Sequence, residues 1–331
     1  MTQEEQYLEQ FVYDDDDWTV LRTDRAARRS PKSKPRRQPK LSQSAVVAEI
    51  AEAAGLEGGF NPTYHPSRYE EGWLVSSLSY FYDEHMITDI LAQVRGGKEA
   101  TVYCCAAHPL TGERLLAAKV YRPQQFRSLR NDKMYREGRA VLTADGRPVK
   151  KTDHRLMRAL GKKTAFGREV EHTSWLMYEY STLQRLYQAG AAVPRPYGVS
   201  DNAILMSYRG DVNMAAPVLS EVRLERPEAE TLFAEVMRNV ELMLAHHLIH
   251  GDLSAYNILY WEGKVTLIDF PQVTNSTTNS RAYVILHRDV TRICEYFSRQ
   301  GVACDPAALV ERLWTRYVDQ ETEGPEAGTT A

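Results

Sequence analysis

Residues 246–271 read HHLIHGDLSAYNILYWEGKVTLIDFP, and this stretch decides the fold. Three side chains with oxygen ligands stand out in it: Asp252, Asn257 five positions later, and Asp269 after a short apolar run. Two apolar segments flank Glu262-Gly263, a pair typical of a tight turn, so the pattern predicts a β-hairpin. This hairpin would bring Asp269 beside Asn257 and close to Asp252.

These three side chains form a pattern that is typical of phosphoryl transfer. Asn257 and Asp269 supply an amide oxygen and a carboxylate, which are ligands that Mg²⁺ prefers, and Mn²⁺ is an alternative metal. Asp252 would then be left to orient an acceptor hydroxyl or a water molecule. A kinase catalytic loop followed by a metal-binding aspartate has this spacing. The alternative interpretation is an ordinary polar hairpin with incidental acids.

The composition predicts a globular protein with a sizeable core. The chain has 331 residues, of which 43% are hydrophobic and 26% charged, and its net charge of −3 gives no global attraction for nucleic acid. No apolar run approaches the ~18–20 residues of a membrane span, and the acidic N-terminus excludes a secretory signal. We therefore expect a cytoplasmic protein with no membrane partner. The four cysteines contain no CxxC pair, so we expect them to stay reduced and fill space.

The two ends of the chain are expected to be disordered. In the leader, residues 1–60, four aspartates at 14–17 precede a basic run at 25–40 that three prolines interrupt. This run is either an electrostatic arm for RNA or another polyanion, or a solvated tail that neutralises the acidic block. A short helix is expected at 42–54. The polar tail at 320–331 carries no structural signal.

A first lobe is expected at 92–208, after a helical extension at 61–91. Residues 95–103 read RGGKEATVY, which predicts a glycine turn between two strands whose amide hydrogens could approach phosphates. An ordinary hairpin turn is the alternative there. In the next predicted strand Lys119 lies among apolar residues, so its ammonium group needs an anionic partner. Glu179, on a helix predicted from Ser174 to Gln188, is that partner.

A basic insertion at 124–172 lacks apolar periodicity, and we expect it to be flexible. It contains Gly161-Lys162-Lys163-Thr164, which is similar to the end of a Walker A loop. That interpretation fails because Leu156 occupies the position of the first glycine and no strand precedes it.

The second lobe, residues 209–319, is expected to be mainly helical. Helices are predicted from Pro227 onward, from Tyr283 to Phe297 and from Ala307 to Tyr317. His246 and His250 have the i, i+4 spacing of a zinc pair, but the glutamate of the zinc motif is absent. We expect His250 to brace the catalytic loop instead.

Over residues 72–318 the chain resembles the RIO family of atypical protein kinases. The motifs that carry the resemblance, in order, are GKEA at 97–100, Lys119, Glu179, HGDLSAYNIL at 250–259 and IDFPQ at 268–272. The long insertion between Lys119 and Glu179 is similar to that of the RIO one branch. The acidic-then-basic leader and the adjacent cysteines Cys104 and Cys105 are more similar to those of bacterial members.

The resemblance implies an α+β, two-lobed protein-kinase-like fold. The N-lobe would be a five-stranded antiparallel sheet with a helix, and the C-lobe would be shortened and mainly helical. ATP would bind between the lobes with Mg²⁺ or Mn²⁺. The implied phosphate-binding residues are Gly96, Gly97, Lys98, Glu99 and Val102. Lys119 would contact the phosphates and pair with Glu179, while Met206 and Tyr208 would flank the adenine. Asp252 would be the catalytic acid/base, and Asn257 and Asp269 would bind the metal.

The implied activity is transfer of the ATP γ-phosphate to serine or threonine, with autophosphorylation and slow ATP hydrolysis. In this family the metal-binding aspartate is associated with an aspartyl-phosphate, so Asp269 is also a candidate phosphoacceptor. Archaeal and eukaryotic members act in small-subunit ribosome maturation, which makes RNA or a ribosomal particle a further candidate partner of the basic segments. The protein substrate is unassigned, and it could be the kinase itself. The 62 residues after Asp269 contain no Ala-Pro-Glu marker, so no usual peptide-docking platform is expected.

Two alternatives come from other functional classes. A small-molecule kinase of the aminoglycoside or choline type would share the HGDL and IDF motifs, although the GKEA and the proline-glutamine after Asp-Phe argue against it. A non-catalytic assembly factor would use its basic segments to bind RNA, and that binding would survive the loss of Asp252.

Overall fold

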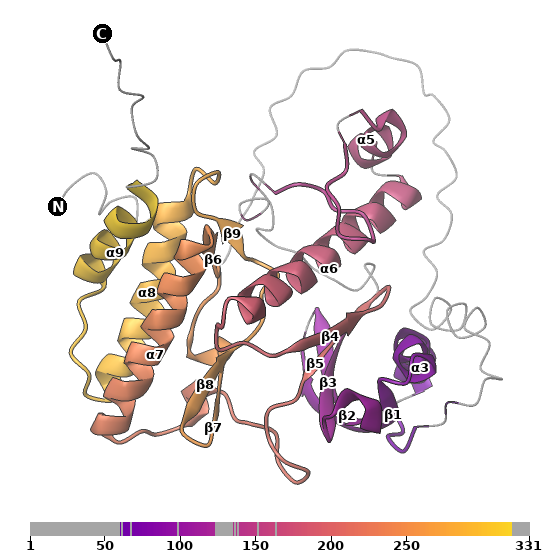
Figure 1. Ribbon diagram of the computed structural model, residues 1–331, viewed down its shortest axis with the longest axis horizontal. Coiled ribbons are helices and arrows are strands. Elements are labelled where there is room, and N and C mark those ends of the chain that lie inside the picture. Colours follow the sequence, from indigo (N-terminus) through magenta and orange to yellow (C-terminus); the bar gives the residue numbers. More distant parts are fainter. Residues whose placement is uncertain are drawn as a thin grey trace, which may run out of the picture. The chain divides into compact units, whose positions relative to one another are not determined.

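The computed structural model describes residue 60 and residues 62–66, 68–97, 99–122, 135, 137, 139–150, 152–162 and 164–319 (Figure 1). Contacts divide the chain into residues 1–41 and 42–331, and every described residue belongs to the second unit. The predicted leader up to residue 59, Lys98, much of the basic insertion and the tail from residue 320 lie outside the described residues.

The N-lobe is built on a five-stranded antiparallel sheet in the order β1-β2-β3-β5-β4, which confirms the predicted sheet. Side chains alternate between its two faces, as they do along any β-strand. On the central strand Leu116, Ala118 and Val120 are fully buried on one face, whereas Lys119 and Tyr121 lie on the other. The strands are β1 (Ile87–Gly96), β2 (Ala100–Ala107), β3 (Leu115–Tyr121), β4 (Pro196–Val199) and β5 (Ala203–Ser207).

Helix α3 (Arg68–Asp83) covers the apolar face of this sheet. Leu74, Leu78 and Phe81 have helical i, i+4, i+7 spacing and are fully buried against β1, β3 and β5. The helix ends at Asp83 and β1 begins at Ile87, so the helical part of the predicted extension is shorter than 61–91. The structure therefore contains a helix within the predicted extension, at Arg68–Asp83.

Two helices run through the region that was predicted to be a flexible insertion. These are α5 (His154–Gly161) and α6 (Ala165–Gln188), so helices occupy part of the stretch in which the sequence showed no apolar periodicity. Helix α6 begins at Ala165 rather than Ser174 because the Thr164 side chain caps it, accepting a hydrogen bond from the Gly167 amide. The stretch that is similar to a Walker A end is therefore a junction between two helices.

The C-lobe contains three helices and the predicted hairpin. The helices are α7 (Arg226–Ala245), α8 (Ala282–Arg299) and α9 (Pro306–Trp314), and a π-helical turn continues α9 over Thr315–Asp319. The hairpin pairs β7 (Ile258–Trp261) with β8 (Lys264–Leu267), while β6 (Leu248–Ile249) pairs with β9 (Thr274–Asn275). Glu262 and Gly263 both have positive φ, 48° and 73°, as a two-residue hairpin turn of this kind requires.

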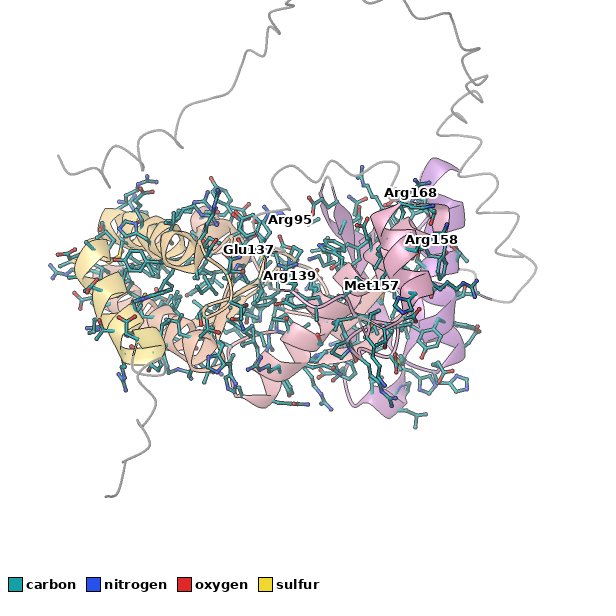
Figure 2. All side chains as sticks on the ribbon, turned by 90° about the horizontal axis from the view of Figure 1, so that it is seen from above. Arg95, Glu137, Arg139, Met157, Arg158 and Arg168 are labelled. Atoms are coloured by element: carbon teal, nitrogen blue, oxygen red, sulfur yellow. A yellow bond between two sulfur atoms is a disulfide. The ribbon has the colours of Figure 1, made fainter. Side chains whose placement is uncertain are left out.

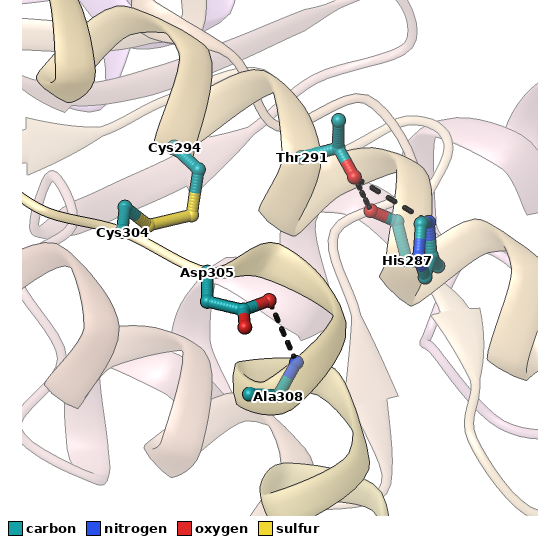
Figure 3. The surroundings of a disulfide bond; sticks show 6 residues. All are labelled: His287, Thr291, Cys294, Cys304, Asp305 and Ala308. Atoms are coloured by element: carbon teal, nitrogen blue, oxygen red, sulfur yellow. Dashed lines mark hydrogen bonds between the residues drawn. A yellow bond between two sulfur atoms is a disulfide. The ribbon is translucent and has the colours of Figure 1, made fainter.

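A disulfide joins Cys294 on α8 to Cys304, with 5.6 Å between their Cα atoms (Figure 3). The expectation that all four cysteines stay reduced is therefore wrong for this pair. The chain turns back after α8 at Gly301, whose φ is +86°, and this brings Cys304 alongside the helix. Cys104 and Cys105 are free and buried on β2, as expected.

The larger of two apolar clusters links the C-lobe helices to the face of the N-lobe sheet that carries Lys119 and Tyr121. It contains Tyr121 of β3, Ile204 of β5 and Leu176 of α6 together with the buried stripe of α7, in which Phe233 is only partly buried. In Figure 1, α6 lies across the sheet on the side that faces the C-lobe helices. Within the described part of the chain, no helix combines the length and the apolar character that crossing a membrane would require.

Candidate active site

Lys119 lies at the centre of the site and contacts two carboxylates. Its Nζ is 2.6 Å from Oε1 of Glu179 on α6 and 2.5 Å from Oδ1 of Asp269, which follows the β7–β8 hairpin. Lys119 and Glu179 are almost fully buried, with 11% and 4% of their side chains exposed, whereas 41% of the Asp269 side chain is exposed. The structure thus places the predicted Lys119–Glu179 pair together and connects it to the C-lobe through Asp269.

Lys119, Glu179 and Asp269 stabilise one another's charged forms although burial opposes ionisation. Burial alone would lower the pKa of Lys119, but the charges of Asp269 and Glu179 outweigh it and raise that pKa well above its usual value. Burial would likewise raise the pKa of Asp269, but the charge and hydrogen bond of Lys119 outweigh this, so the pKa of Asp269 is lowered. Lys119 is therefore an ammonium and Asp269 a carboxylate at neutral pH.

Tyr121 completes the support of Glu179, and sequence reasoning did not single it out. Its hydroxyl donates a hydrogen bond to Oε2 of Glu179, and its ring centroid lies 5.2 Å from Lys119 Nζ. Burial, followed by the charge of Glu179, raises the pKa of Tyr121 well above its usual value, so the hydroxyl stays protonated. The signal was present, because residues two apart on a strand share a face.

Asp252 and Asn257 lie together in the catalytic loop. The Asn257 side-chain amide donates to the Asp252 carbonyl at 2.8 Å and to its carboxylate Oδ2 at 3.3 Å. The backbone amide of Ile268 donates to the Asn257 carbonyl at 3.0 Å, which places the next residue, Asp269, beside Asn257. Asp269 itself has a φ of +72°, a left-handed conformation that aspartate tolerates better than most residues.

The oxygen atoms around Asn257 fit a hard divalent cation. The Asn257 amide oxygen accepts no hydrogen bond from any residue that the structure describes, and the Asp269 carboxylate is partly open to solvent. Mg²⁺ commonly takes only one or two protein ligands, with phosphates and water completing its octahedron. No cluster of three or more histidine, cysteine or acidic side chains suited to a metal occurs among the described residues.

His250 braces the loop, as predicted. It is buried, and its Nε2 lies 3.1 Å from the carbonyl oxygen of Ile268. Its ring also packs against that of Phe270, with 4.9 Å between the centroids. His250 thus connects the catalytic loop to the segment that carries Asp269.

Helix α8 holds the catalytic loop from the other side. Asp289 accepts a 2.8 Å hydrogen bond from the Gly251 amide, and Arg288 donates to the Gly251 carbonyl oxygen. Arg292, one turn after Arg288, forms an ion pair with Asp252, with 2.8 Å between its Nη1 and the carboxylate Oδ1. Sequence reasoning missed Arg292, although the i, i+4 spacing from Arg288 places both on one helical face.

Burial dominates the electrostatics of Asp289. It raises the pKa of this carboxyl above its usual value, although the charges of Arg288 and His250 and the hydrogen bonds that Asp289 accepts act in the opposite direction. Asp289 is almost completely buried, and its role is to receive the Gly251 amide.

The predicted phosphate loop connects β1 to β2. The Gly97 amide donates to the Ala100 carbonyl at 2.9 Å, and a Cβ atom at Gly97 would lie only 2.9 Å from that same oxygen. Gly96 ends β1, the Glu99 carbonyl accepts from the Arg122 amide at 2.9 Å, and Val102 is paired with Lys119 across β2 and β3. Lys98 lies outside the described residues. Arg95 lies in the region between the two lobes in Figure 2, and its charge helps to lower the pKa of Asp269.

The predicted adenine linker follows β5. Met206 is paired with Ala117 of β3 and is partly buried, while Tyr208 lies just beyond the end of the strand. Burial, with the nearby Cys104 thiol and Asp211, raises the pKa of Tyr208 to about 12, so its hydroxyl stays protonated. The strand itself ends at Ser207.

The chain between Lys119 and Glu179 also reaches the C-lobe. Arg139 donates to the carbonyl oxygens of Pro271, at 2.9 Å, and Val273, and its guanidinium lies 4.3 Å from the ring centroid of Tyr178. Glu137 accepts a 3.0 Å hydrogen bond from the Ser280 hydroxyl. In Figure 2, Glu137 and Arg139 lie together between the two lobes. No sequence signal indicated this crossing, because the segment has no periodicity.

The geometry agrees with what the family comparison finds. A model of the RIO domain matches residues 111–309, a range that includes Lys119, Glu179, Asp252, Asn257 and Asp269. This chain belongs to the RIO family. Among the RIO relatives, the Rio1 serine/threonine-protein kinase of Haloferax volcanii is 34% identical over 138 residues, which are 42% of this chain and 47% of that protein. The Chaetomium thermophilum RIO1 kinase is 29% identical over 231 residues, 66% of this chain and 41% of the relative, so these matches span about half of each relative's length or less.

Solved structures show the same fold. The crystal structure of the Rio2 kinase of Chaetomium thermophilum in complex with ADP, Mg²⁺ and phosphoaspartate matches with a TM-score of 0.51 at 17% identity. The match covers 83% of this chain and 86% of that one. The RIO chain described here therefore has the α+β, two-lobed protein-kinase-like fold that the sequence predicts.

Proposed function

We propose that this RIO protein is an ATP-dependent serine/threonine protein kinase. The observation that carries the proposal is the double contact of Lys119, which joins Glu179 in the N-lobe to Asp269 in the C-lobe. An ammonium held in this way faces the position that ATP phosphates occupy in protein kinases. The Asn257 side chain contacts Asp252, and the Asn257 backbone carbonyl accepts a hydrogen bond from the amide of Ile268, the residue before Asp269. An acceptor hydroxyl would enter on this side.

Each side chain then has a distinct task. Glu179 and Tyr121 hold Lys119 so that it donates to the α- and β-phosphates. Asp269 and Asn257 would hold Mg²⁺, and the same donors suit Mn²⁺; the metal would supply positive charge that neutralises the phosphates. Asp252 would accept the proton of the serine or threonine hydroxyl as that oxygen attacks the γ-phosphorus; the bond from the γ-phosphorus to the β,γ-bridging oxygen breaks, and ADP leaves.

The nucleotide would lie between the phosphate loop and the linker. The loop of Gly96, Gly97, Lys98 and Glu99 would lie over the phosphates, with Val102 below the ribose and phosphates. Met206 and Tyr208 would flank the adenine. Asp269 must release Lys119 when phosphates and metal enter, because its Oδ1 now contacts that ammonium at 2.5 Å.

The test is label transfer from γ-labelled ATP with Mg²⁺ to the purified protein, in wild type and in Asp252→Asn. Wild type should label itself, and Asp252→Asn should do so about 10²–10⁴ times more slowly while binding nucleotide almost equally well. Asp201→Asn, which changes an exposed carboxylate on the β4–β5 turn, is the matched control and should transfer at the wild-type rate. Equal transfer by wild type and Asp252→Asn would refute the mechanism.

A second candidate function is ATP hydrolysis through an aspartyl-phosphate on Asp269. The support is the phosphoaspartate in the Rio2 complex, whose fold this chain shares, together with the partly exposed Asp269 carboxylate. Acid-stable label on serine or threonine would support the protein kinase. Hydroxylamine-labile label that is lost in Asp269→Asn would support the aspartyl-phosphate, with release of free phosphate as the product.

The partners of this kinase are also proposals. Its first substrate would be itself or an unidentified protein, and its location would be the cytoplasm. RNA or a ribosomal particle would bind its basic segments, and such binding should weaken steeply with salt. A small-molecule phosphotransferase would instead label an added aminoglycoside or choline and leave the protein unlabelled.

A further inference from the structure

Arg292 brings a positive charge to the acceptor side of the active site. Its Nη1 lies 2.8 Å from Oδ1 of Asp252, and the carboxylate of Asp252 would receive the substrate proton. The two side chains are 41% and 40% exposed, so solvent and ligands reach both. An ion pair this exposed contributes little to stability and exchanges partners easily.

Among the residues that the structure describes, few use the Arg292 guanidinium. A guanidinium carries five N–H donors, and Asp252 is the only hydrogen-bond partner of Arg292 that the described residues supply. Arg288 differs, because it already donates to Gly251, Tyr135 and Asp289. Arg292 is therefore the member of this pair that has donors to offer to an entering anion.

The position of the Arg292–Asp252 ion pair indicates which kind of anion would bind Arg292. The acceptor hydroxyl must approach the Asp252 carboxylate, so a group in contact with Arg292 would lie next to that hydroxyl. A carboxylate fits the planar fork of a guanidinium in a bidentate manner. In a peptide substrate, the residues next to the acceptor would lie close enough to it to contact Arg292.

We propose that Arg292 forms an anion subsite that selects acidic peptides, in which aspartate or glutamate flanks the acceptor serine or threonine. The proposal rests on the proposed kinase function and adds its substrate class. A peptide carboxylate draws the guanidinium away from Asp252 and leaves Oδ1 open to the acceptor hydroxyl. The loop keeps its place during this exchange, since Arg288 and Asp289 still hold both backbone groups of Gly251.

A purely positioning role for Arg292 makes different predictions. If Arg292 only orients Asp252, its loss lowers kcat equally for acidic and neutral peptides and leaves peptide binding unchanged. If Arg292 binds the substrate, its loss raises KM for acidic peptides alone. The split between kcat and KM therefore separates the two roles.

The first experiment measures binding without catalysis. Fluorescent peptides of one length carry alanine at the acceptor position and either aspartate or asparagine on both sides, and anisotropy reports their affinity for the full-length protein. Wild type should bind the aspartate peptide roughly five to ten times more tightly, and Arg292→Gln should remove that preference. Arg299→Gln, an exposed arginine at the end of the same helix, should retain it.

The second experiment reverses the charge. Arg292→Lys should keep part of the preference, and Arg292→Glu should prefer a lysine-flanked peptide over the aspartate-flanked one. In transfer assays with serine at the acceptor position, Arg292→Gln should raise KM for the acidic peptide by the factor seen in binding, with kcat changed by less than about twofold.

The outcomes of the two proposals are distinguishable. Equal binding of both peptides by wild type, or a preference that survives in Arg292→Gln, overturns the anion subsite even if the protein labels itself. A preference that Arg292→Gln abolishes, in a protein that transfers no phosphate to any acceptor, upholds the subsite and refutes the kinase function.

Discussion

The two loops that face each other across the active site are held in different ways. In the catalytic loop, α8 side chains bind both the amide and the carbonyl group of Gly251, and the buried His250 connects the loop to Ile268. The phosphate loop has mainly its own backbone contacts, such as the bond from the Gly97 amide to the Ala100 carbonyl. Gly96 and Gly97 are exposed.

This difference separates chemistry from nucleotide binding. Groups that act in the transition state are most effective when they are fixed before the substrate arrives. A loop that closes over phosphates gains from being free to adapt to them. We therefore expect changes to the buried groups that hold the catalytic loop to cost rate and stability together, and changes at the phosphate loop to act mainly on ATP affinity.

The largest expected effect is that of Lys119→Met, because Lys119 joins the two sides. Phosphoryl transfer should fall by about 10²–10⁴ for want of the charge that stabilises the phosphates. Loss of the ammonium also leaves the buried Glu179 without its cationic partner, which should lower the free energy of unfolding by about 3 kcal/mol. Label transfer and urea unfolding measure the two effects, and transfer within tenfold of wild type would contradict the assigned role.

Gly251→Ala tests how tightly α8 holds the catalytic loop. Gly251 has a φ of +84°, and a Cβ atom there would run into the carbonyl oxygen of Gln272. Both the strain and the collision should destabilise the fold, by about 2–4 kcal/mol, and abolish transfer. The matched control is Gly263→Ala, at φ +73° with nothing within 4 Å of the added Cβ, which should cost only about 1 kcal/mol. Equal costs at the two glycines would show that the loop is not held as described.

Removal of the Cys294–Cys304 disulfide tests the far end of the same helix. The closed loop spans 10 residues, so its loss should lower the free energy of unfolding by about 2–3 kcal/mol. The double variant Cys294→Ala/Cys304→Ala should unfold at the same urea concentration with and without reductant. Wild type should match the variant only in reductant, and a wild type that is insensitive to reductant would mean that the bond makes no contribution.

Asp289→Asn tests the buried acceptor of the Gly251 amide through pH. Because the pKa of Asp289 is raised in the folded state, its contribution to stability is fully present below about pH 4 and is lost as the pH rises through the folded-state pKa. Asparagine keeps an acceptor oxygen but does not titrate. The unfolding free energy of wild type relative to Asp289→Asn should therefore fall on the order of 1 kcal/mol as the pH is raised from about 4.5 to about 8. A constant difference, or one that grows with pH, would contradict the direction of the pKa shift.

The sequence predicted those parts of the fold and site that local patterns encode. The hairpin from Ile258 to Leu267 follows from its turn residues and alternation, and the partner of Lys119 follows from the cost of burying an unpaired ammonium. The five-stranded sheet came from resemblance to the family, and the structure confirms it.

The rest depended on contacts between segments that share no local signal. Arg139 contacts Pro271, more than a hundred positions away in the sequence, and no residue near Arg139 signals this contact. The sequence predicted α6 only from Ser174, because periodicity gave no sign of the helix at 165–173, whereas the Thr164 cap could have been recognised. Cys294 and Cys304 meet only because α8 ends and the chain reverses at Gly301.

The smallest expected effect is that of Gly97→Ala, and it tests the looser of the two loops. The new Cβ would lie 2.9 Å from the Ala100 carbonyl oxygen, so the turn must shift by a few tenths of an ångström where phosphates would approach. Since the loop carries little of the fold's stability, the unfolding free energy should change by less than about 0.5 kcal/mol. KM for ATP should rise roughly threefold to tenfold while kcat stays within about twofold, because the groups that act on the acceptor lie on the other loop. A fall in kcat with unchanged KM would mean that the phosphate loop, too, is positioned for the transition state, and the division between the two loops would have to be abandoned.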